Sequence, residues 1–378
     1  MIIGIDIRVL GSKTKSGVEE YTENLLAHML PINRDVKYKL FYSSFSSKRN
    51  SYPWLSLPNV EVHNFRIPNK LLFLAANFLK RPHIDEMMGG VDVFFSPHFF
   101  LTSLSPLCKH IITFHDLSYV RYPEFFSLRK RIWHSLEMRP RYQSRYSDKI
   151  IAVSESTKSD LVNLYQLDPA RIEVIYSGIS PNIKKPSEDE LEVFRNRMKL
   201  PKKFILFLGK LEPRKNIPSL IRAFNIIKRE GRFDDLHLVL IGSKGWLYQD
   251  IFKEIDNSEF KDKIITIDNI PDIDRSFYYS LAQVFVYPSF FEGFGFPPLE
   301  AIVCGTPVLV ANNSSLPEIV KRGAVVIDPH NIKEIAFSIA SILTNSRLKE
   351  ALMYEGLGRI KEFDWNESAE KTLKYLIK

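Results

Sequence analysis

The sequence predicts an α/β protein made of two doubly wound, Rossmann-like domains, each a parallel sheet covered by helices. Three observations lead to this prediction. At 378 residues, the chain exceeds the roughly 250–300 residues at which a single hydrophobic core stops growing. Short β-rich runs alternate with longer amphipathic segments along the chain. Several of these runs are apolar throughout, as strands are when helices cover both faces of a parallel sheet.

The first domain is expected to span residues 1–182, completed by a helix at 363–378. The runs in this half with the composition of strands are residues 2–7, 36–42, 60–65, 91–95, 110–115, 149–153 and 172–176. Turn-forming residues at 177–187 then interrupt the alternation, so we place the domain boundary there.

The second domain, residues 183–362, repeats the pattern. Its expected strands are residues 204–208, 236–241, 264–267, 284–287, 307–310 and 325–327. Open parallel sheets bind ligands beyond the carboxyl ends of their strands. We therefore expect the two domains to face each other across a cleft, with the functional residues directly after the strands.

Composition narrows the class of protein. Hydrophobic residues at 45% and charged residues at 25% are typical of globular proteins. Cys108 and Cys304 stand alone in apolar segments, which favours small buried side chains over a disulfide or metal site.

The amino-terminal run lacks the features of a signal peptide, and no apolar stretch approaches the roughly 20 residues needed to cross a bilayer. A cytoplasmic protein is expected. The aromatic residues lie mostly in apolar runs, so no nucleic-acid partner is expected.

The net charge of +8 is concentrated in the first half of the chain. Between residues 127 and 147, one acidic residue, Glu137, faces a cluster of basic ones: Arg129, Lys130, Arg131, Arg139, Arg141 and Arg145. This segment suits an anionic membrane surface or a phosphate-bearing acceptor, and a solvated helix face explains it equally well. The apolar residues 71–79 favour a buried helix over a shallow membrane insertion.

The most specific segment is Pro-Ser-Phe-Phe-Glu-Gly-Phe-Gly-Phe-Pro-Pro-Leu-Glu at 288–300, which follows an expected strand. Gly293 and Gly295 leave a loop where backbone N–H groups can approach an anion, and the next helix points its positive end the same way. Glu292 and Glu300 could accept hydrogen bonds from sugar hydroxyls. Alternatively, Glu300 is a structural partner of a nearby arginine and Glu292 a plain loop charge.

A second segment, residues 209–216, also follows a strand and begins a helix. Arg214 and Lys215 lie there, although the helix dipole disfavours cations at a helix start. An anion would remove that penalty, and a pyrophosphate would match the arginine fork and the lysine point charge.

These residues together resemble the signature of the family 4 retaining glycosyltransferases of the GT-B fold. The resemblance covers nearly the whole chain and includes a first glycine loop, here reduced to Gly17, and a histidine motif at His115. It implies that Arg214 and Lys215 bind the donor diphosphate, Glu300 the ribose and Glu292 the donor sugar. The backbone of Gly293, Phe294 and Gly295 would hold sugar or phosphate, and Gly17 would let the backbone approach the phosphate.

The resemblance also implies the chemistry. His115 would contact the transferred sugar and, with Glu292, form the catalytic group, while the leaving phosphate deprotonates the acceptor on the same face. Alternatively, His115 and Asp116 could serve only to end a strand and open a turn. Residues 114–126 and 242–246 most resemble enzymes that use GDP-mannose in bacterial surface polysaccharide synthesis. The expected acceptor is a glycan or a polyprenyl-linked glycan.

Other activities remain as alternatives. A sugar-nucleotide epimerase shares the two-domain architecture, and a non-catalytic sugar-nucleotide-binding protein would keep Arg214, Lys215 and Glu300. The spacing of Asp272 and Asp274 fits a metal-binding Asp-x-Asp, but a helix-like segment follows, so helix capping is the preferred explanation. We expect no catalytic metal and no cofactor besides the donor substrate.

Overall fold

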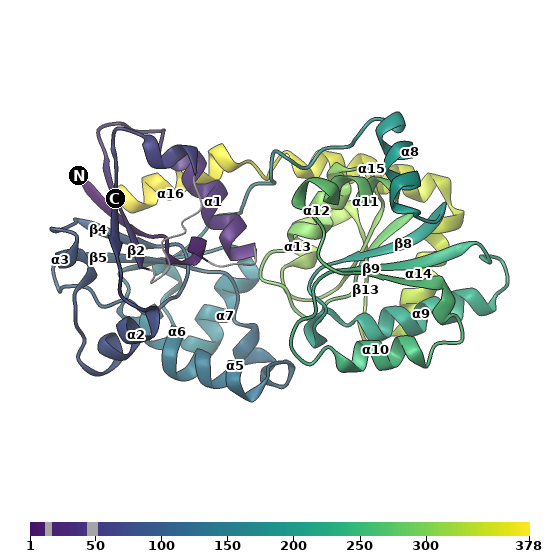
Figure 1. Cartoon of the computed structure of the whole chain (residues 1–378), viewed down its shortest axis with the longest axis horizontal. Helices are drawn as coiled ribbons and strands as arrows, with labels where there is room; N and C mark the ends of the chain where they lie inside the picture. Colours follow the sequence, from purple (N-terminus) through teal and green to yellow (C-terminus); the bar gives the residue numbers. More distant parts are fainter. Residues whose placement is uncertain (12–16, 44–51) are drawn as a thin grey trace. The chain divides into compact units, whose positions relative to one another are not determined.

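The computed structural model describes residues 1–11, 17–43 and 52–378 and divides the chain into two compact units (Figure 1). Unit 1 comprises Met1–Arg121, Leu128–Gly178 and Phe363–Lys378. Unit 2 comprises Tyr122–Ser127 and Ile179–Glu362. Each unit is built on its own parallel sheet with flanking helices, which confirms the predicted fold class. The expectation of a shared cleft stays a prediction.

Unit 1 contains a seven-stranded sheet in the order β3-β2-β1-β4-β5-β6-β7, parallel throughout. Its strands are β1 (Ile2–Asp6), β2 (Lys37–Ser43), β3 (Val60–Phe65), β4 (Val93–Ser96), β5 (Lys109–Phe114), β6 (Lys149–Ala152) and β7 (Ile172–Val174). Ile5, in β1, lies level with Leu40 and Phe95 on the two neighbouring strands, and all three are fully buried. Burial on both faces explains why these strands lack polar alternation.

The helices of unit 1 connect these strands, except α16, which follows unit 2 at the end of the chain. They are α1 (Gly17–Met29), α2 (Asn69–Phe78), α3 (Ile84–Met87), α4 (Ser118–Arg121), α5 (Leu128–Ile132), the π-helix η4 (Trp133–Met138), α6 (Pro140–Tyr146), α7 (Glu155–Tyr165) and α16 (Trp365–Ile377), with short 3₁₀ turns at Arg8–Gly11, Pro53–Ser56 and Pro169–Arg171.

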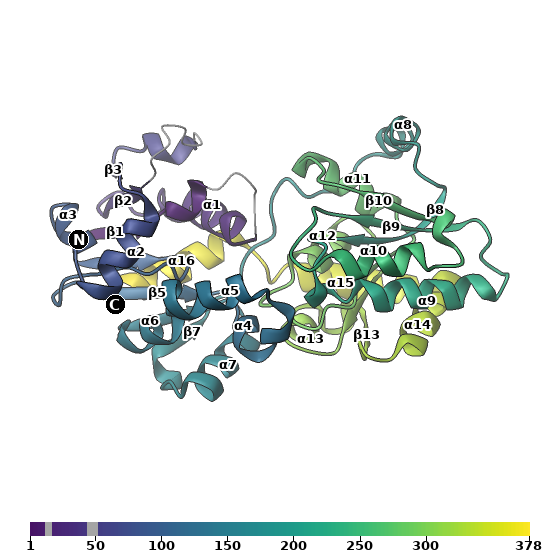
Figure 2. The same cartoon turned by 60° about the horizontal axis from the view of Figure 1, so that its bottom comes forward.

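The last helix, α16, packs beside α1 and so brings the two ends of the chain into one unit (Figure 2). The rings of Tyr21 and Trp365 meet edge to face at 5.8 Å, and Ser368 Oγ donates to the Tyr176 carbonyl at 2.6 Å. Cys108, in the core of unit 1, and Cys304, in the core of unit 2, are both buried and unpaired, as predicted.

Unit 2 contains a six-stranded parallel sheet in the order β10-β9-β8-β11-β12-β13. Its strands are β8 (Lys203–Leu208), β9 (Leu236–Ile241), β10 (Ile264–Ile267), β11 (Val284–Tyr287), β12 (Val308–Ala311) and β13 (Val325–Ile327). Its helices are α8 (Glu188–Met198), α9 (Ile217–Arg229), α10 (Gln249–Asp256), α11 (Arg275–Leu281), α12 (Phe296–Val303), α13 (Leu316–Val320), α14 (Ile332–Thr344) and α15 (Ser346–Ile360), with 3₁₀ turns at Pro123–Phe125, Pro213–Lys215, Lys261–Lys263, Asp272–Asp274 and Lys321–Gly323.

Residues 122–127 come from the first half of the chain but pack with unit 2 through aromatic rings. Phe125 stacks on Phe290 at 5.2 Å, and Phe126 stacks on Trp246 at 5.4 Å. Trp246 Nε1 donates to the Phe125 carbonyl at 2.5 Å. The predicted first domain, residues 1–182, includes residues 122–127, because the strand pattern of the sequence gives no signal for these stacking contacts.

Candidate active site

The candidate site in unit 2 lies where the strand order reverses. β8 and β11 are neighbours, yet the chain continues from β8 to one side of the sheet and from β11 to the other. At such a switch point the connections diverge and leave a crevice beyond the carboxyl ends of the strands. The two segments singled out in the sequence, 209–216 and 288–300, follow these two strands.

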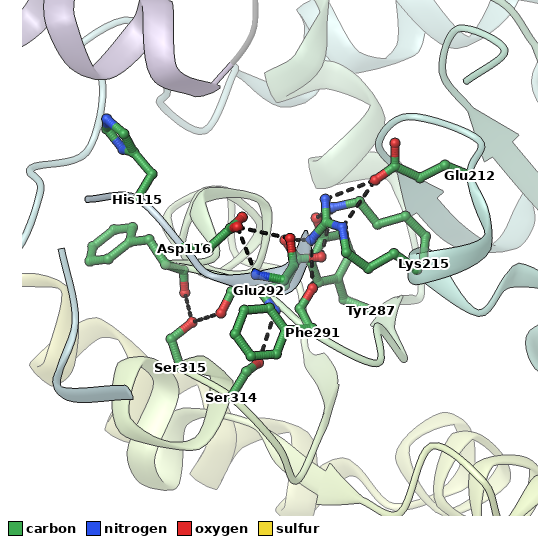
Figure 3. Close-up of polar contacts among 12 residues, drawn as sticks. His115, Asp116, Glu212, Lys215, Tyr287, Phe291, Glu292, Ser314 and Ser315 are labelled. Atoms are coloured by element: carbon green, nitrogen blue, oxygen red, sulfur yellow. Dashed lines mark hydrogen bonds and ion pairs between the residues drawn. The ribbon is translucent and has the colours of Figure 1, made fainter. Parts of the chain in front are cut away.

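The loop after β11 is shaped by its glycines and by two serines. Gly295 precedes α12 with φ +110°, a backbone conformation that L side chains rarely adopt. Ser315 Oγ donates to the carbonyls of Glu292 and Phe294 at 3.0 and 2.7 Å, and Ser314 Oγ accepts from the Glu292 N–H at 2.9 Å (Figure 3). The two serines therefore fix the backbone of Glu292 independently of the contacts that its side chain makes.

The loop after β8 is tied to the loop after β11. Asn216 adopts a left-handed conformation, and its amide donates to the carbonyls of Pro288 and Pro329 at 3.2 and 2.8 Å. The N–H of Phe290 donates to the Arg214 carbonyl at 2.8 Å. These bonds bring Arg214 and Lys215 alongside Glu292.

Glu292 pairs with both cations, and its contact with Lys215 can be followed in Figure 3. Lys215 Nζ lies 2.6 Å from one carboxylate oxygen, and Arg214 Nη1 lies 2.8 Å from the other. Burial disfavours the charged carboxylate, but Arg214 and then Lys215 outweigh it and lower the Glu292 pKa to about 2. Glu292 is therefore ionised, and the interpretation of a plain loop charge does not fit its 7% exposure.

Neighbouring side chains complete this cluster. Lys215 Nζ also donates to the Tyr287 hydroxyl at 2.6 Å, and Arg214 pairs with Glu212 at 2.8 Å. Burial lowers the pKa of Lys215, the Arg214 charge adds to this effect, and Glu292 opposes it. Both cations can donate to a diphosphate, which would share them with the carboxylates of Glu212 and Glu292. Sequence reasoning missed Tyr287 and Glu212, although Tyr287 ends a predicted strand and Glu212 lies two residues before Arg214.

Glu300 lies on α12, with 1% of its surface exposed. Its carboxylate pairs with Arg275 at 2.8 Å and accepts from the Tyr279 hydroxyl at 2.8 Å. These contacts match the alternative in which Glu300 is a structural partner of a nearby arginine. Its role as a ribose ligand stays a prediction.

In unit 1, His115 follows β5 at the carboxyl edge of the sheet. Its Nε2 lies 2.8 Å from the Pro97 carbonyl, so Nε2 carries the proton in the neutral ring, and its ring meets Tyr21 edge to face at 4.8 Å. Burial lowers the His115 pKa, which keeps the imidazole neutral near pH 7. Asp116 accepts from the Ser118 N–H and hydroxyl at 3.0 and 2.8 Å and so opens the following turn.

The switch point of unit 1 lies between β1 and β4. Gly17 begins α1 beyond it, with open space where a side chain would stand, while residues 12–16 of the expected glycine loop lie outside the described residues. A buried pair, Asp6 and Arg8 at 2.6 Å, lies there with His98, whose pKa burial lowers to about 4. The sequence analysis missed this group, although Asp6 ends the first strand.

The Asp-x-Asp motif is explained differently from the prediction. Asp274 precedes α11 but makes no side-chain capping bond, and its carboxylate lies 3.8 Å from Arg197. Asp272 lies 3.6 Å from Arg275. Both carboxylates thus have cationic partners. Across residues 1–11, 17–43 and 52–378, no three side chains of the metal-binding types gather into one group.

Family models match both halves of the chain. The model for Glycosyltransferase Family 4 matches residues 15–183, and the model for glycosyl transferases group 1 matches residues 188–358. The O-antigen chain mannosyltransferase B of Escherichia coli is 29% identical over 293 residues, 74% of this chain and 73% of that protein.

Solved structures share the architecture of the whole chain. The sucrose-phosphate synthase of Thermosynechococcus elongatus superposes with a TM-score of 0.76 at 18% identity, covering 99% of this chain and 98% of that one. The Anabaena protein HepE, in complex with UDP-glucose, superposes with a TM-score of 0.71 at 18% identity over the full length of both chains. The chain therefore belongs to the family 4 retaining glycosyltransferases, a family of hexosyltransferases with the GT-B fold.

Proposed function

We propose that this enzyme transfers mannose from GDP-mannose to a glycan or a polyprenyl-linked glycan at the inner face of the cytoplasmic membrane. The observation that carries the donor side is the buried cluster of Arg214, Lys215 and Glu292 at the switch point of unit 2. The choice of mannose and of a surface polysaccharide rests on the similarity to the E. coli O-antigen mannosyltransferase.

In the proposed reaction, the bond between the sugar C1 and the β-phosphate oxygen breaks, and a bond from C1 to the acceptor oxygen forms on the same face. The acceptor proton passes to the departing phosphate oxygen. Arg214 and Lys215 stabilise the charge that develops on this phosphate, since cations already in place need no reorganisation. Glu292 accepts hydrogen bonds from hydroxyls of the donor sugar, and the neutral imidazole of His115 contacts the same sugar.

A thermal-shift panel of GDP-mannose, UDP-glucose and a dTDP-sugar tests the donor. With every donor at the same concentration, the one with the lowest Kd should raise Tm the most, since a ligand at 100 times its Kd stabilises the protein by roughly 2.7 kcal/mol. UDP-glucose is the essential comparison, because a structural relative binds it. A larger shift with UDP-glucose would replace GDP-mannose in the proposal.

Product analysis then separates three activities. A glycosyl group joined to the acceptor with its anomeric configuration kept supports the transferase. A free nucleotide sugar with inverted stereochemistry would indicate an epimerase, and binding without turnover would indicate a sensor.

A further inference from the structure

We propose that α2, α5 and the π-helix η4 of unit 1 form a surface that inserts shallowly into an anionic lipid bilayer. The sequence favoured a buried helix at 71–79, but only one face of α2 is buried. Leu72 and Phe73 pack inward, whereas Leu71, Leu74 and Phe78 are 56%, 54% and 81% exposed. Their spacing places these three on one side of the helix.

A second exposed apolar stripe runs along α5 and η4. Leu128, Ile132 and Leu136, four residues apart, are 70%, 46% and 64% exposed. Near α2, Leu79 adds a side chain that is 71% exposed. We call these residues together the apolar face: Leu71, Leu74, Phe78, Leu79, Leu128, Ile132 and Leu136.

The two stripes are held together in unit 1. Asn77 donates to the Leu136 carbonyl at 3.0 Å, directly beside Phe78, and Arg139 donates to the Asn77 side chain at 3.1 Å. Beneath them, Phe73 and Met138 belong to one buried cluster. The apolar face is therefore a built surface, and its exposed side chains lie over a core that does not depend on them.

Basic residues accompany the apolar face. Lys70 lies in the first turn of α2, Lys80 and Arg81 follow the end of this helix, and Arg129, Lys130 and Arg131 are exposed on α5. In the sequence, no acidic residue occurs between 66 and 84, and Glu137 is the one acidic residue between 127 and 147.

The positive charge beside the apolar face indicates which partner this surface fits. A second copy of the chain would bring two positive surfaces together, which costs free energy, whereas anionic headgroups attract each cation above an apolar layer that receives the leucines. No helix within the described ranges is long and apolar enough to cross a membrane, so insertion would be interfacial. The inference rests on the proposed function only for its purpose, which is to reach a lipid-linked acceptor.

Vesicle cosedimentation of the full chain, without donor or acceptor, tests this inference separately from catalysis. We expect binding to phosphatidylglycerol vesicles and little to phosphatidylcholine vesicles. The double variant Leu74→Ser/Phe78→Ser should bind anionic vesicles about tenfold or more weakly, because it removes inserted apolar area. The matched control is Val193→Ser/Phe337→Ser, whose parent residues on unit 2 are 68% and 74% exposed. Equal binding by both double variants would overturn the proposal.

Site-specific labelling gives a second readout. Since Cys108 and Cys304 are buried, Phe78→Cys and Phe337→Cys can each carry an environment-sensitive fluorophore at one exposed thiol. Anionic vesicles should shift the emission of the label at position 78 to shorter wavelength and leave that at 337 unchanged. No shift at 78 would overturn the proposal, as would self-association that Leu74→Ser/Phe78→Ser abolishes without vesicle binding. Donor binding by the parent would then leave the proposed function standing.

Discussion

The two cations that pair with Glu292 are also the residues predicted to bind the donor diphosphate. Arg214 and Lys215 are proposed to hold the donor diphosphate, yet both contact Glu292 at 2.6–2.8 Å. A buried carboxylate keeps the two like charges together, since Arg214 and Lys215 would otherwise repel each other in a poorly solvated site. The same carboxylate repels an incoming phosphate, so Glu292 affects both stability and affinity.

Replacing Lys215 tests the diphosphate site. Lys215→Ala should weaken binding of a nucleoside diphosphate by roughly 10- to 100-fold, the usual effect of losing a hydrogen bond to a charged group. Isothermal titration calorimetry measures this, with circular dichroism to confirm folding. Lys253→Ala, at a lysine whose side chain is 72% exposed, is the control. Parent-like affinity in Lys215→Ala would refute the assignment.

Replacing Glu292 tests the shared-cation interpretation. Glu292→Gln keeps the shape of the side chain and removes its charge, so GDP should bind more tightly by about tenfold while the transfer rate falls. Glu254→Gln, which alters the surface pair of Arg222 and Glu254, is the control. If GDP affinity is unchanged or falls, Glu292 does not compete with the diphosphate.

The same variant has a pH signature. The Glu292 pKa is lowered from 4.5 to about 2 in the folded protein, so its charge stabilises the fold above pH 4.5. This contribution is lost as the pH falls through about 2. In urea titrations between pH 5 and 2, the parent should lose free energy of unfolding faster than Glu292→Gln. Parallel curves would contradict the lowered pKa.

At the scale of elements, the entry into α12 depends on one backbone conformation. Gly295 has φ +110°, and a Cβ there would lie 2.9 Å from Leu316 Cδ2. Gly295→Ala should therefore lower the free energy of unfolding by about 1–3 kcal/mol and weaken donor binding, because Phe294 and Glu292 are set by the same turn.

Gly358→Ala is the matched control for this substitution. Gly358 lies inside α15 with open space around its Cβ position, so alanine there should be neutral or stabilising by up to about 1 kcal/mol. Urea unfolding of both variants decides the question. Equal free energies of unfolding would show that the turn tolerates a side chain.

At the scale of the whole molecule, the chain returns to its first unit at its end. Trp365, Leu373 and Leu376 on α16 are 3%, 5% and 2% exposed. Deleting residues 363–378 should destabilise unit 1 by more than roughly 5 kcal/mol, comparable with the total stability of a domain. Unit 2 should keep its protection, because its sheet and core are its own.

Hydrogen exchange followed by mass spectrometry resolves the two units. We expect fast exchange in β1 and β5 and slow exchange in β8 and β11 after the deletion. Removing residues 377–378 alone is the control, since Ile377 is 45% exposed. Protected strands in both units would show that α16 is dispensable to the first.

The fold could be predicted from sequence because period and apolarity are local properties. Every predicted strand appears within a few residues of its expected place, since short apolar runs such as 284–287, alternating with amphipathic segments, are typical of a parallel sheet covered on both faces. Gly293, Gly295, Arg214 and Lys215 could also be singled out locally, because glycine permits a close backbone approach and the helix dipole disfavours cations at a helix start.

Only the tertiary structure shows which side chains contact each other. That Glu292 meets Lys215, that Glu300 meets Arg275, and that residues 122–127 stack on unit 2 follow from strand order, which places distant segments side by side. The exposure of Leu74 and Phe78 could not be predicted from the sequence either. An apolar run shows which residues favour burial, and only the packing of neighbouring elements determines which of them are buried.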